Sequence, residues 1–268
     1  MKLTVLADNN TYIDQYYLGE PALSFYIEDG ANRILFDTGY SDAFIRNAEK
    51  MQIDLGGLTH IVLSHGHNDH TRGLTFLWDR YDLTGVSLIA HPSAFSPKQH
   101  CGLYVGAPFS IHDCVSHGLR LVDGSVPVKI TERLTFLGEI PRVTDFESKE
   151  PCGISVETKQ GDFLPDDSAL VYEGAAGCFV MTGCSHSGIC NIILQAMRIS
   201  SKATVTGIIG GFHLLENNTQ VAETITFLAK HTKGMLYPCH CVSLAAKFAM
   251  MKVLPVTEVG VGLQLTVE

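Results

Sequence analysis

A short segment near position 65 holds four side chains that can bind a metal ion. An apolar run at 61–64 leads directly into His65, His67, Asp69 and His70. Side chains two apart at the end of a strand point the same way, so His65 and His67 can converge on one ion. The turn that follows can bring Asp69 and His70 round to a second ion. Imidazole and carboxylate ligands suit zinc, manganese or iron, and we predict a site for two divalent ions, with zinc favoured.

Two ions need more than four ligating residues, and three later histidines are candidates. His186, His213 and His240 each come just after an apolar segment. His213 follows a Gly-Gly pair, where the backbone can approach a ligand closely. It could bind metal, polarise a substrate or hydrogen-bond a leaving group, because histidine serves all three tasks. We predict a catalytic-site role for His213 and leave the choice among these tasks open.

The hydrophobic pattern predicts the elements that must position these residues. Short apolar runs bounded by Gly, Pro, Asp or Asn predict strands at 3–7, 22–28, 33–39, 59–65, 86–92, 133–140, 169–173, 178–184, 205–212 and 234–240. Cap signals and helical spacing predict helices at 41–52, 188–200, 219–231 and 243–252. This order favours an α/β fold in which two sheets pack face to face between outer helices. We predict one domain over 1–268, with the less periodic stretch 93–130 as an inserted loop or lid.

Composition narrows the classes of partner. The net charge is −9 and no Lys/Arg stripe occurs, so binding to nucleic acid through clustered cations is disfavoured. No apolar window is long enough for a membrane span and no signal segment is evident, so we expect a cytoplasmic protein that does not insert into a membrane. The eight cysteines are expected to be reduced, because a chain of this length can build its own core. The expected partner is an anionic small-molecule substrate.

Two of these motifs are similar to those of a known family. The loop HGHNDH (65–70) resembles the His-x-His-x-Asp-His signature of the metallo-β-lactamase superfamily, and FDTG (36–39) resembles its Asp-Thr-Gly motif. The resemblance implies a four-layer αββα sandwich. It also implies that Asp37 orients a ligating histidine, and that His186 and His240 are the later metal ligands.

The resemblance also shows one departure from the family pattern. Many members have an aspartate that bridges both ions after a glycine at a strand end, and Cys184 stands at the matching position. Cys184 is either a thiolate ligand or a small buried residue, since free cysteines are usually buried and inert. The bridging arrangement is therefore open at this point, and so is the filling of both metal positions.

Several other segments resemble one subfamily, named after the archaeal 7,8-dihydropterin-6-methyl-4-(β-D-ribofuranosyl)aminobenzene-5′-phosphate synthase. They span nearly the whole chain: GEIPR (138–142), LPDDSAL (164–170), TGCSHSGI (182–189), GGFHL (210–214) and PCHC (238–241). In the founding member the reaction joins a dihydropterin alcohol diphosphate to a ribofuranosyl-aminobenzene phosphate and releases diphosphate. The resemblance thus implies that a transferase is compatible with this metal chemistry.

The residues themselves predict hydrolysis. A two-ion site lowers the pKa of a bound water to about 7, and Asp69 can both ligate an ion and orient that water. Phosphoesters, lactones, thioesters and amides all remain open as substrates. Arg72 and Arg142 are candidates for gripping an anion, because the guanidinium fork matches phosphate and carboxylate. His91 could also reach the substrate, and Asp8 either lines the pocket or forms a turn.

The ligand set also bears on two other classes of function, an iron redox protein and a catalytically silent binding protein. Members of the fold that bind iron for redox chemistry usually have Glu in place of the second loop histidine and carry a flavodoxin domain. This chain has His67 and no such domain, which disfavours an iron redox protein. A catalytically silent small-molecule-binding protein would have lost ligands, and here they are mostly intact.

Overall fold

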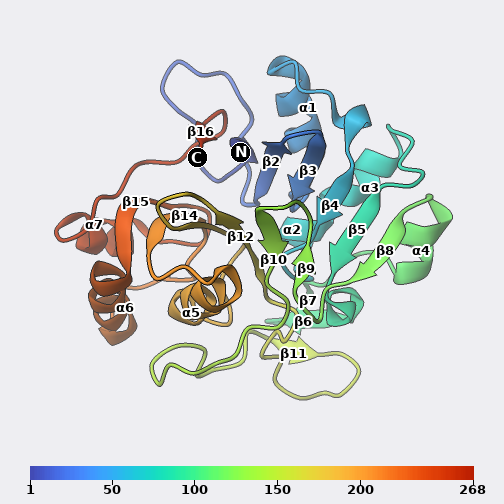
Figure 1. The fold of residues 1–268 in the computed structure, drawn as a ribbon. Helices are drawn as coiled ribbons and strands as arrows, with labels where there is room; N and C mark the ends of the chain where they lie inside the picture. Colours follow the sequence, from blue (N-terminus) through green and yellow to red (C-terminus); the bar gives the residue numbers. More distant parts are fainter.

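Two β-sheets packed face to face form the centre of the molecule. The computed structural model describes residues 1–268 and places helices on the outer face of each sheet (Figure 1). The seven strands of the first sheet, in spatial order, are β16 (Gln264–Thr266), β1 (Lys2–Ala7), β2 (Ser24–Asp29), β3 (Asn32–Phe36), β4 (His60–Val62), β5 (Ser87–Ala90) and β8 (Arg120–Asp123). The six strands of the second are β15 (Thr232–Pro238), β14 (Val205–Gly210), β13 (Cys178–Thr182), β12 (Ala169–Glu173), β10 (Leu134–Phe136) and β9 (Val128–Lys129).

The helices complete a four-layer αββα arrangement, as predicted. The first half of the chain contributes α1 (Ala43–Lys50), α2 (Asn68–Thr71), α3 (Gly73–Trp78) and α4 (Ile111–Ser116), with 3-10 turns η1 (Leu55–Gly57) and η2 (Pro92–Phe95). The second half contributes α5 (Ile189–Ser200), α6 (Thr219–His231) and α7 (Leu244–Met251). The predicted helix starts have a physical basis, because Asn218 accepts from Val221 N and Ser243 from Ala246 N as N-caps. None of the helices is long and apolar enough to span a membrane.

Three buried apolar clusters hold the layers together. Between the sheets, Phe25 and Phe36 of the first sheet belong to the same cluster as Phe136 and Met181 of the second. A second cluster fills the space under the helices of the first half, and a third lies under α5, α6 and α7. Strands such as β13 are therefore buried along their whole length, which explains their uninterrupted apolar sequence.

Parallel strand pairs bring the functional segments to one edge. In the first sheet β3, β4, β5 and β8 run parallel, and in the second β13, β14 and β15 do so. Their carboxyl ends are followed by the segments that hold Asp37, His65, Cys184, His213 and His240. Open α/β sheets bind ligands at such ends, so this edge is where a site is expected.

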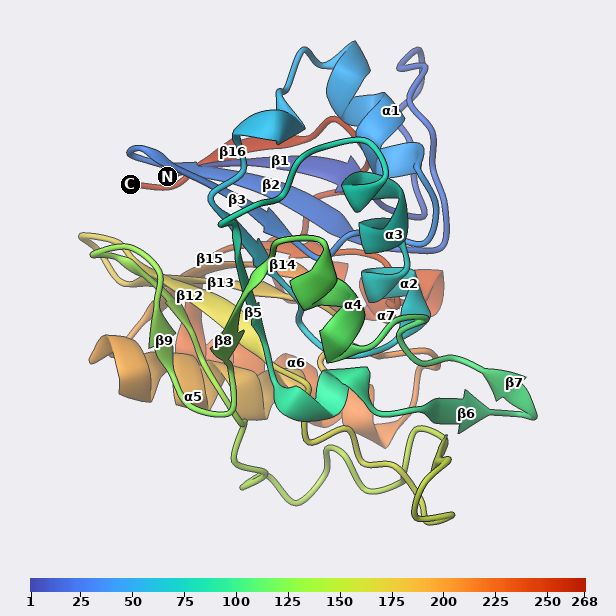
Figure 2. The same cartoon turned by 90° about the vertical axis from the view of Figure 1, so that its right-hand side faces the viewer.

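The predicted insertion at 93–130 is wrong in its extent. Residues 120–123 form β8, which pairs in parallel with β5 and so belongs to the first sheet. The part that leaves the sandwich is a hairpin of β6 (Lys98–His100) and β7 (Leu103–Tyr104), seen projecting in Figure 2. β6 also pairs with β11 (Ile154–Ser155), from a later segment. Strands of two to four residues carry too little periodicity to be predicted, and their pairing is long-range.

Candidate metal centre

Three histidines form a first potential metal position. His65 Nε2 lies 3.1 Å from His67 Nδ1, and the ligand atoms of both lie within 4.8 Å of that of His186. The Nε2 atom of His186 is buried and has no hydrogen-bond partner. Burial holds the pKa of His65 and His186 well below the usual range and lowers that of His67 to about 4. The three imidazoles are therefore neutral at pH 7, with lone pairs free to bind a cation.

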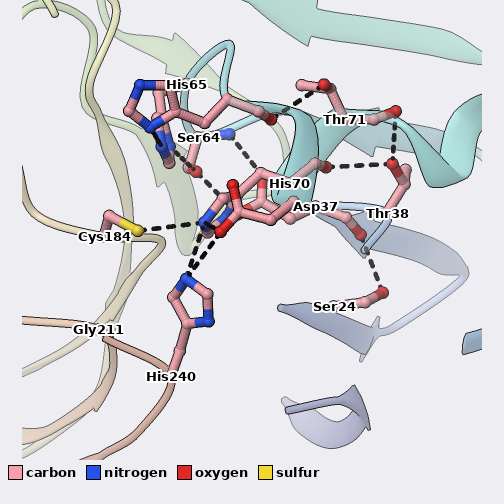
Figure 3. A network of polar contacts seen from close by, with 12 residues as sticks. Ser24, Asp37, Thr38, Ser64, His65, His70, Thr71, Cys184, Gly211 and His240 are labelled. Carbon is pink, nitrogen blue, oxygen red and sulfur yellow. Dashed lines mark hydrogen bonds and ion pairs between the residues drawn. The ribbon is translucent and has the colours of Figure 1, made fainter. Parts of the chain in front are cut away.

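Four residues form a second potential position beside the first. His70 Nε2 lies 3.1 Å from Cys184 Sγ and 3.2 Å from His240 Nε2 (Figure 3). An Asp69 carboxylate oxygen lies 3.6 Å from His70 Nε2 and 3.3 Å from His240 Nε2. In a tetrahedral zinc site, bonds of about 2.0–2.3 Å put the ligand atoms roughly 3.3–3.8 Å apart. The spacing of this carboxylate, thiol and imidazole pair is close to that geometry.

Electrostatics at the second position also favour a cation. Burial alone would raise the pKa of Asp69, but His70 and His240 outweigh it and lower that pKa. Burial would lower the pKa of His70, but the carboxylates of Asp69 and Asp37 outweigh it and raise that pKa. The negative potential of these two carboxylates would also favour a divalent cation at this position.

Asp37 orients one histidine of each position. Its carboxylate accepts from Ser64 N, Ser64 Oγ and His70 Nδ1, each at 2.7 Å. Because the Ser64 hydroxyl donates to Asp37, it accepts from His65 Nδ1 at 2.9 Å. Both histidines then carry their proton on Nδ1 and leave Nε2 bare for a metal. Asp37 has a positive φ of 58°, a strained conformation that fits a functional role.

A cavity of about 580 Å³ opens over both positions. Its lining comes from both halves of the chain: Asn9, Pro21, Tyr40, His67, Asn68, Asp69, His100, Val105, Cys152, Cys184, His186, His213, Leu215, His240 and Cys241. None of these residues is Lys or Arg. Bound cations would therefore have to supply the positive charge that an anionic substrate needs. The donor set fits divalent cations, because the imidazole, carboxylate and thiol groups of seven side chains converge on two adjacent positions.

His213 lies next to the first position and outside the second. Its ring centroid is 4.3 Å from that of His186, and its backbone φ is +48°. Burial lowers the pKa of His213, so the ring is neutral and can accept a proton. The three tasks predicted for it all remain compatible with this placement.

The other predicted site residues have different surroundings. Asp8 is buried and accepts from His240 N and Asn10 N, both at 2.9 Å, so it positions His240 and does not line the cavity. The Arg72 guanidinium lies over the Tyr40 ring, 4.4 Å from its centroid; Tyr40 lines the cavity and Arg72 does not. Its predicted substrate contact stays a prediction.

Two predicted substrate contacts are not supported. Arg142 donates to the carbonyl oxygens of Phe163 and Leu164, which occupies its guanidinium with backbone. His91 Nε2 lies 3.0 Å from Glu139 Oε1, and His91 Nδ1 accepts a hydrogen bond from Ser93 N at 3.0 Å. Neither residue lines the cavity.

Sequence reasoning gave no role to two neighbouring acids that support the site. Asp166 accepts from Gly66 N, in the middle of the metal loop, at 2.7 Å. Asp167 accepts from Ser187 N at 2.9 Å and from the Ser187 hydroxyl, next to His186. Both are 1% exposed. The sequence did contain a signal for this role, because two consecutive acids stand just before the buried apolar strand β12. Acids buried next to such a strand need dedicated hydrogen-bond partners.

Comparison with known proteins indicates one family. The family model described as the metallo-β-lactamase superfamily matches residues 18–162. The uncharacterized protein MJ0448 of Methanocaldococcus jannaschii is 30% identical over 244 residues, covering 91% of each chain. The 7,8-dihydropterin-6-methyl-4-(β-D-ribofuranosyl)-aminobenzene-5′-phosphate synthase of the same organism is 28% identical, covering 94% of this chain and 91% of its own.

A solved structure extends the likeness to the whole fold. It is that of Tm1679, a metal-dependent hydrolase of the β-lactamase superfamily, with 27% identity and a TM-score of 0.84 over 100% of this chain and 99% of that one. The family model covers more than half of the sequence, and the relative at 30% identity spans nearly all of it. The chain therefore belongs to the metallo-β-lactamase superfamily.

Proposed function

We propose that this protein is a hydrolase that uses two divalent ions, zinc above all, to cleave an ester, thioester or amide bond in an anionic small molecule. The observation that carries the proposal is the pair of adjacent ligand sets that open into one cavity. Histidine and cysteine donors favour zinc over magnesium or calcium. The chain's membership of the metallo-β-lactamase superfamily also supports a metal-dependent enzyme.

Asp69 and His213 have different roles in the proposed hydrolysis. When bound, the ions would polarise the scissile carbonyl or phosphoryl oxygen and make water acidic enough to ionise near pH 7. The Asp69 side chain is 29% exposed and lines the cavity, so a free carboxylate oxygen can orient the attacking water. His213 is neutral and also lines the cavity, beside His186, where an imidazole nitrogen can hold a proton for the leaving group.

A synthase-type transfer between two phosphorylated small molecules is the second candidate. A further hollow of about 310 Å³ adjoins the main cavity and shares His100, Cys152, His186 and His213 with it. The site therefore has room for ligands on two sides of His186. The 28% identity with the synthase supports this candidate, and the resemblance of Tm1679 supports the first.

Metal content and activity test the proposal together. Elemental analysis is expected to find about two zinc ions per chain in the wild type and fewer in His67→Ala and His240→Ala. The exposed His112 is the matched control, and His112→Ala should keep both ions. A panel of phosphodiesters, lactones and thioesters should be cleaved by the wild type and the control only.

The outcomes separate the two candidates. A wild type that binds no metal after reconstitution would overturn the proposal. Two bound ions without hydrolysis of any compound would contradict the hydrolase and favour the transferase. Cobalt(II) loading adds a check on Cys184, because a thiolate ligand gives a sulfur-to-cobalt charge-transfer band that Cys184→Ser should abolish.

A further inference from the structure

A buried lysine lies at the base of the projecting hairpin. Lys98, the first residue of β6, is 3% exposed although the rest of the hairpin points into solvent (Figure 2). Its ammonium lies 3.1 Å from Asp166 Oδ1 and 3.3 Å from Asp162 Oδ2, and it donates to the Ser93 carbonyl at 3.1 Å. Lysine is almost never fully buried unless it is paired. These three contacts are what allow Lys98 to be buried at this place.

The second oxygen of Asp166 holds the metal loop. Asp166 Oδ2 accepts from Gly66 N at 2.7 Å, and Gly66 separates His65 from His67. On its other side Gly66 is pressed against η2, since a Cβ there would lie 2.1 Å from the carbonyl oxygen of Ala94. The peptide between the two histidines is thus fixed between a carboxylate and the backbone of η2.

The hairpin holds the same loop at a second point. Asn68 N donates to Val105 O at 2.8 Å, and His67 forms a β-bridge with Gly106. The hairpin segment therefore contacts the loop on both sides of His67. Before His67 the contact runs from Lys98 through Asp166 to Gly66, and after His67 it is the backbone hydrogen bond of Asn68 to Val105. Val105 also lines the main cavity, so one segment contacts both the loop and the substrate space.

We propose that Lys98, acting through Asp166, is the positioning residue that sets the geometry of the first metal position. This inference rests on the proposed function only in taking His65, His67 and His186 as one ligand set. The ammonium balances the charge of the buried carboxylate and keeps both of its oxygens in place. Asp166 can then make a charge-assisted hydrogen bond to Gly66, which fixes the distance between the two loop histidines.

The test compares four variants that differ in charge and in the acceptor they offer to Gly66. Lys98→Met leaves Asp166 without its closest cation. Lys98→Met/Asp166→Asn removes both charges and keeps an acceptor for Gly66, whereas Lys98→Met/Asp166→Leu removes both charges and the acceptor. Asp162→Asn is the matched control, because Asp162 pairs with the same ammonium and does not touch the metal loop.

Cobalt(II) titration with visible absorption is the main measurement, with urea unfolding beside it. Lys98→Met and the Leu double variant should bind the first ion about 10–100-fold more weakly, the usual effect of losing a group that orients ligands. The Asn double variant should recover most of that affinity, and Asp162→Asn should stay within about threefold of wild type. A merely structural ion pair would instead make affinity follow the urea midpoint in all variants.

Amide hydrogen exchange on the metal-free protein gives an independent readout. Exchange of a peptide covering residues 63–68 should be faster in Lys98→Met and in the Leu variant than in wild type. This result would stand even if the wild type bound no cobalt, so failure of the proposed function and of this inference can be told apart. Wild-type exchange in Lys98→Met, or equal effects of Asp162→Asn and Lys98→Met, would overturn the positioning role.

Discussion

At the scale of single residues, charge balance governs the metal centre. Neutral His65, His67 and His186 have their ring nitrogens facing one another, and the Asp69 carboxylate and His70 lie next to them. Lone pairs that converge without a proton or cation repel one another. The same contacts become favourable once a cation lies between them, which is why buried ligand sets of this kind are tied to metal binding.

Asp167 predicts how the stability of the metal-free protein depends on pH. Burial raises its pKa to about 6, and one of its oxygens has no hydrogen-bond partner. The folded chain keeps this proton where the unfolded chain, with a pKa near 3.8, has lost it. The stabilising contribution is therefore complete below about pH 4 and is lost as the pH rises through about 6.

Asp167→Asn should remove this dependence, because the amide can still accept from Ser187 and does not ionise. Between pH 5 and 7.5 the free energy of unfolding of the variant should gain about 1.4 kcal/mol relative to wild type, which corresponds to one pKa unit. Urea unfolding of both metal-free proteins at the two pH values measures it. The exposed Asp145 provides a control through Asp145→Asn, and a pH-independent difference would contradict the assignment.

At the scale of elements, the start of α3 sets how closely the metal loop packs on β3. A Cβ on Gly73 would lie 1.7 Å from the carbonyl oxygen of Thr38, directly after Asp37. Thr38 in turn donates through its hydroxyl to the carbonyl oxygens of His70 and Thr71. The absence of a side chain at 73 is thus what lets α2 and α3 approach the end of β3.

Gly73→Ala should therefore be destabilising. Overpacking of this kind costs about 1–3 kcal/mol, and the clash is with backbone that cannot move without displacing Asp37. Gly57→Ala is the matched control, since its Cβ would find its nearest neighbour at 3.7 Å. Equal unfolding midpoints of the two variants in urea would show that the packing at Gly73 relaxes without cost.

Elements differed in how well the sequence predicted them. The helices at 188–200, 219–231 and 243–252 were found almost to the residue, because each has a long apolar stripe on a defined period. The turn expected at Asp69 and His70 is the short helix α2, and α3 was not predicted. Their four and six residues follow from packing on β3 and from the metal loop, and not from a periodic pattern.

At the scale of the whole molecule, the metal centre joins the two sheets. Its first-half ligands follow β4 of the first sheet, and its second-half ligands follow β13 and β15 of the second. An ion bound between them cross-links segments that are far apart in the unfolded chain. Ion binding would therefore add to the stability of the whole fold, because the unfolded chain does not hold the ligands together.

Metal removal should lower the melting temperature. At free zinc 100-fold above the dissociation constant, each ion adds about 2.7 kcal/mol, which for a chain of this size is roughly 5–10 °C. Calorimetry in zinc-buffered and chelator-treated solutions measures the shift. A His67→Ala/His240→Ala double variant should show no zinc-dependent shift, and a full shift in that variant would place the stabilising ions elsewhere.

What the sequence by itself determined is local or periodic. The spacing of His65, His67, Asp69 and His70 after an apolar strand is enough to predict a metal loop, since neighbouring residues on a strand and turn have few geometric choices. The apolar periods likewise predicted the layers and the main helices. These features depend on residues close together in the chain, so a short window contains their cause.

Only the tertiary structure decided which distant residues support that loop. Lys98 and Asp166 are 68 positions apart, and Cys184 and His70 are 114 apart, yet each pair is in contact. Their meeting depends on strand order, on the pairing of β6 with β11 and on the packing of one sheet against the other. Such contacts are set by the burial of the whole core, which no local pattern encodes.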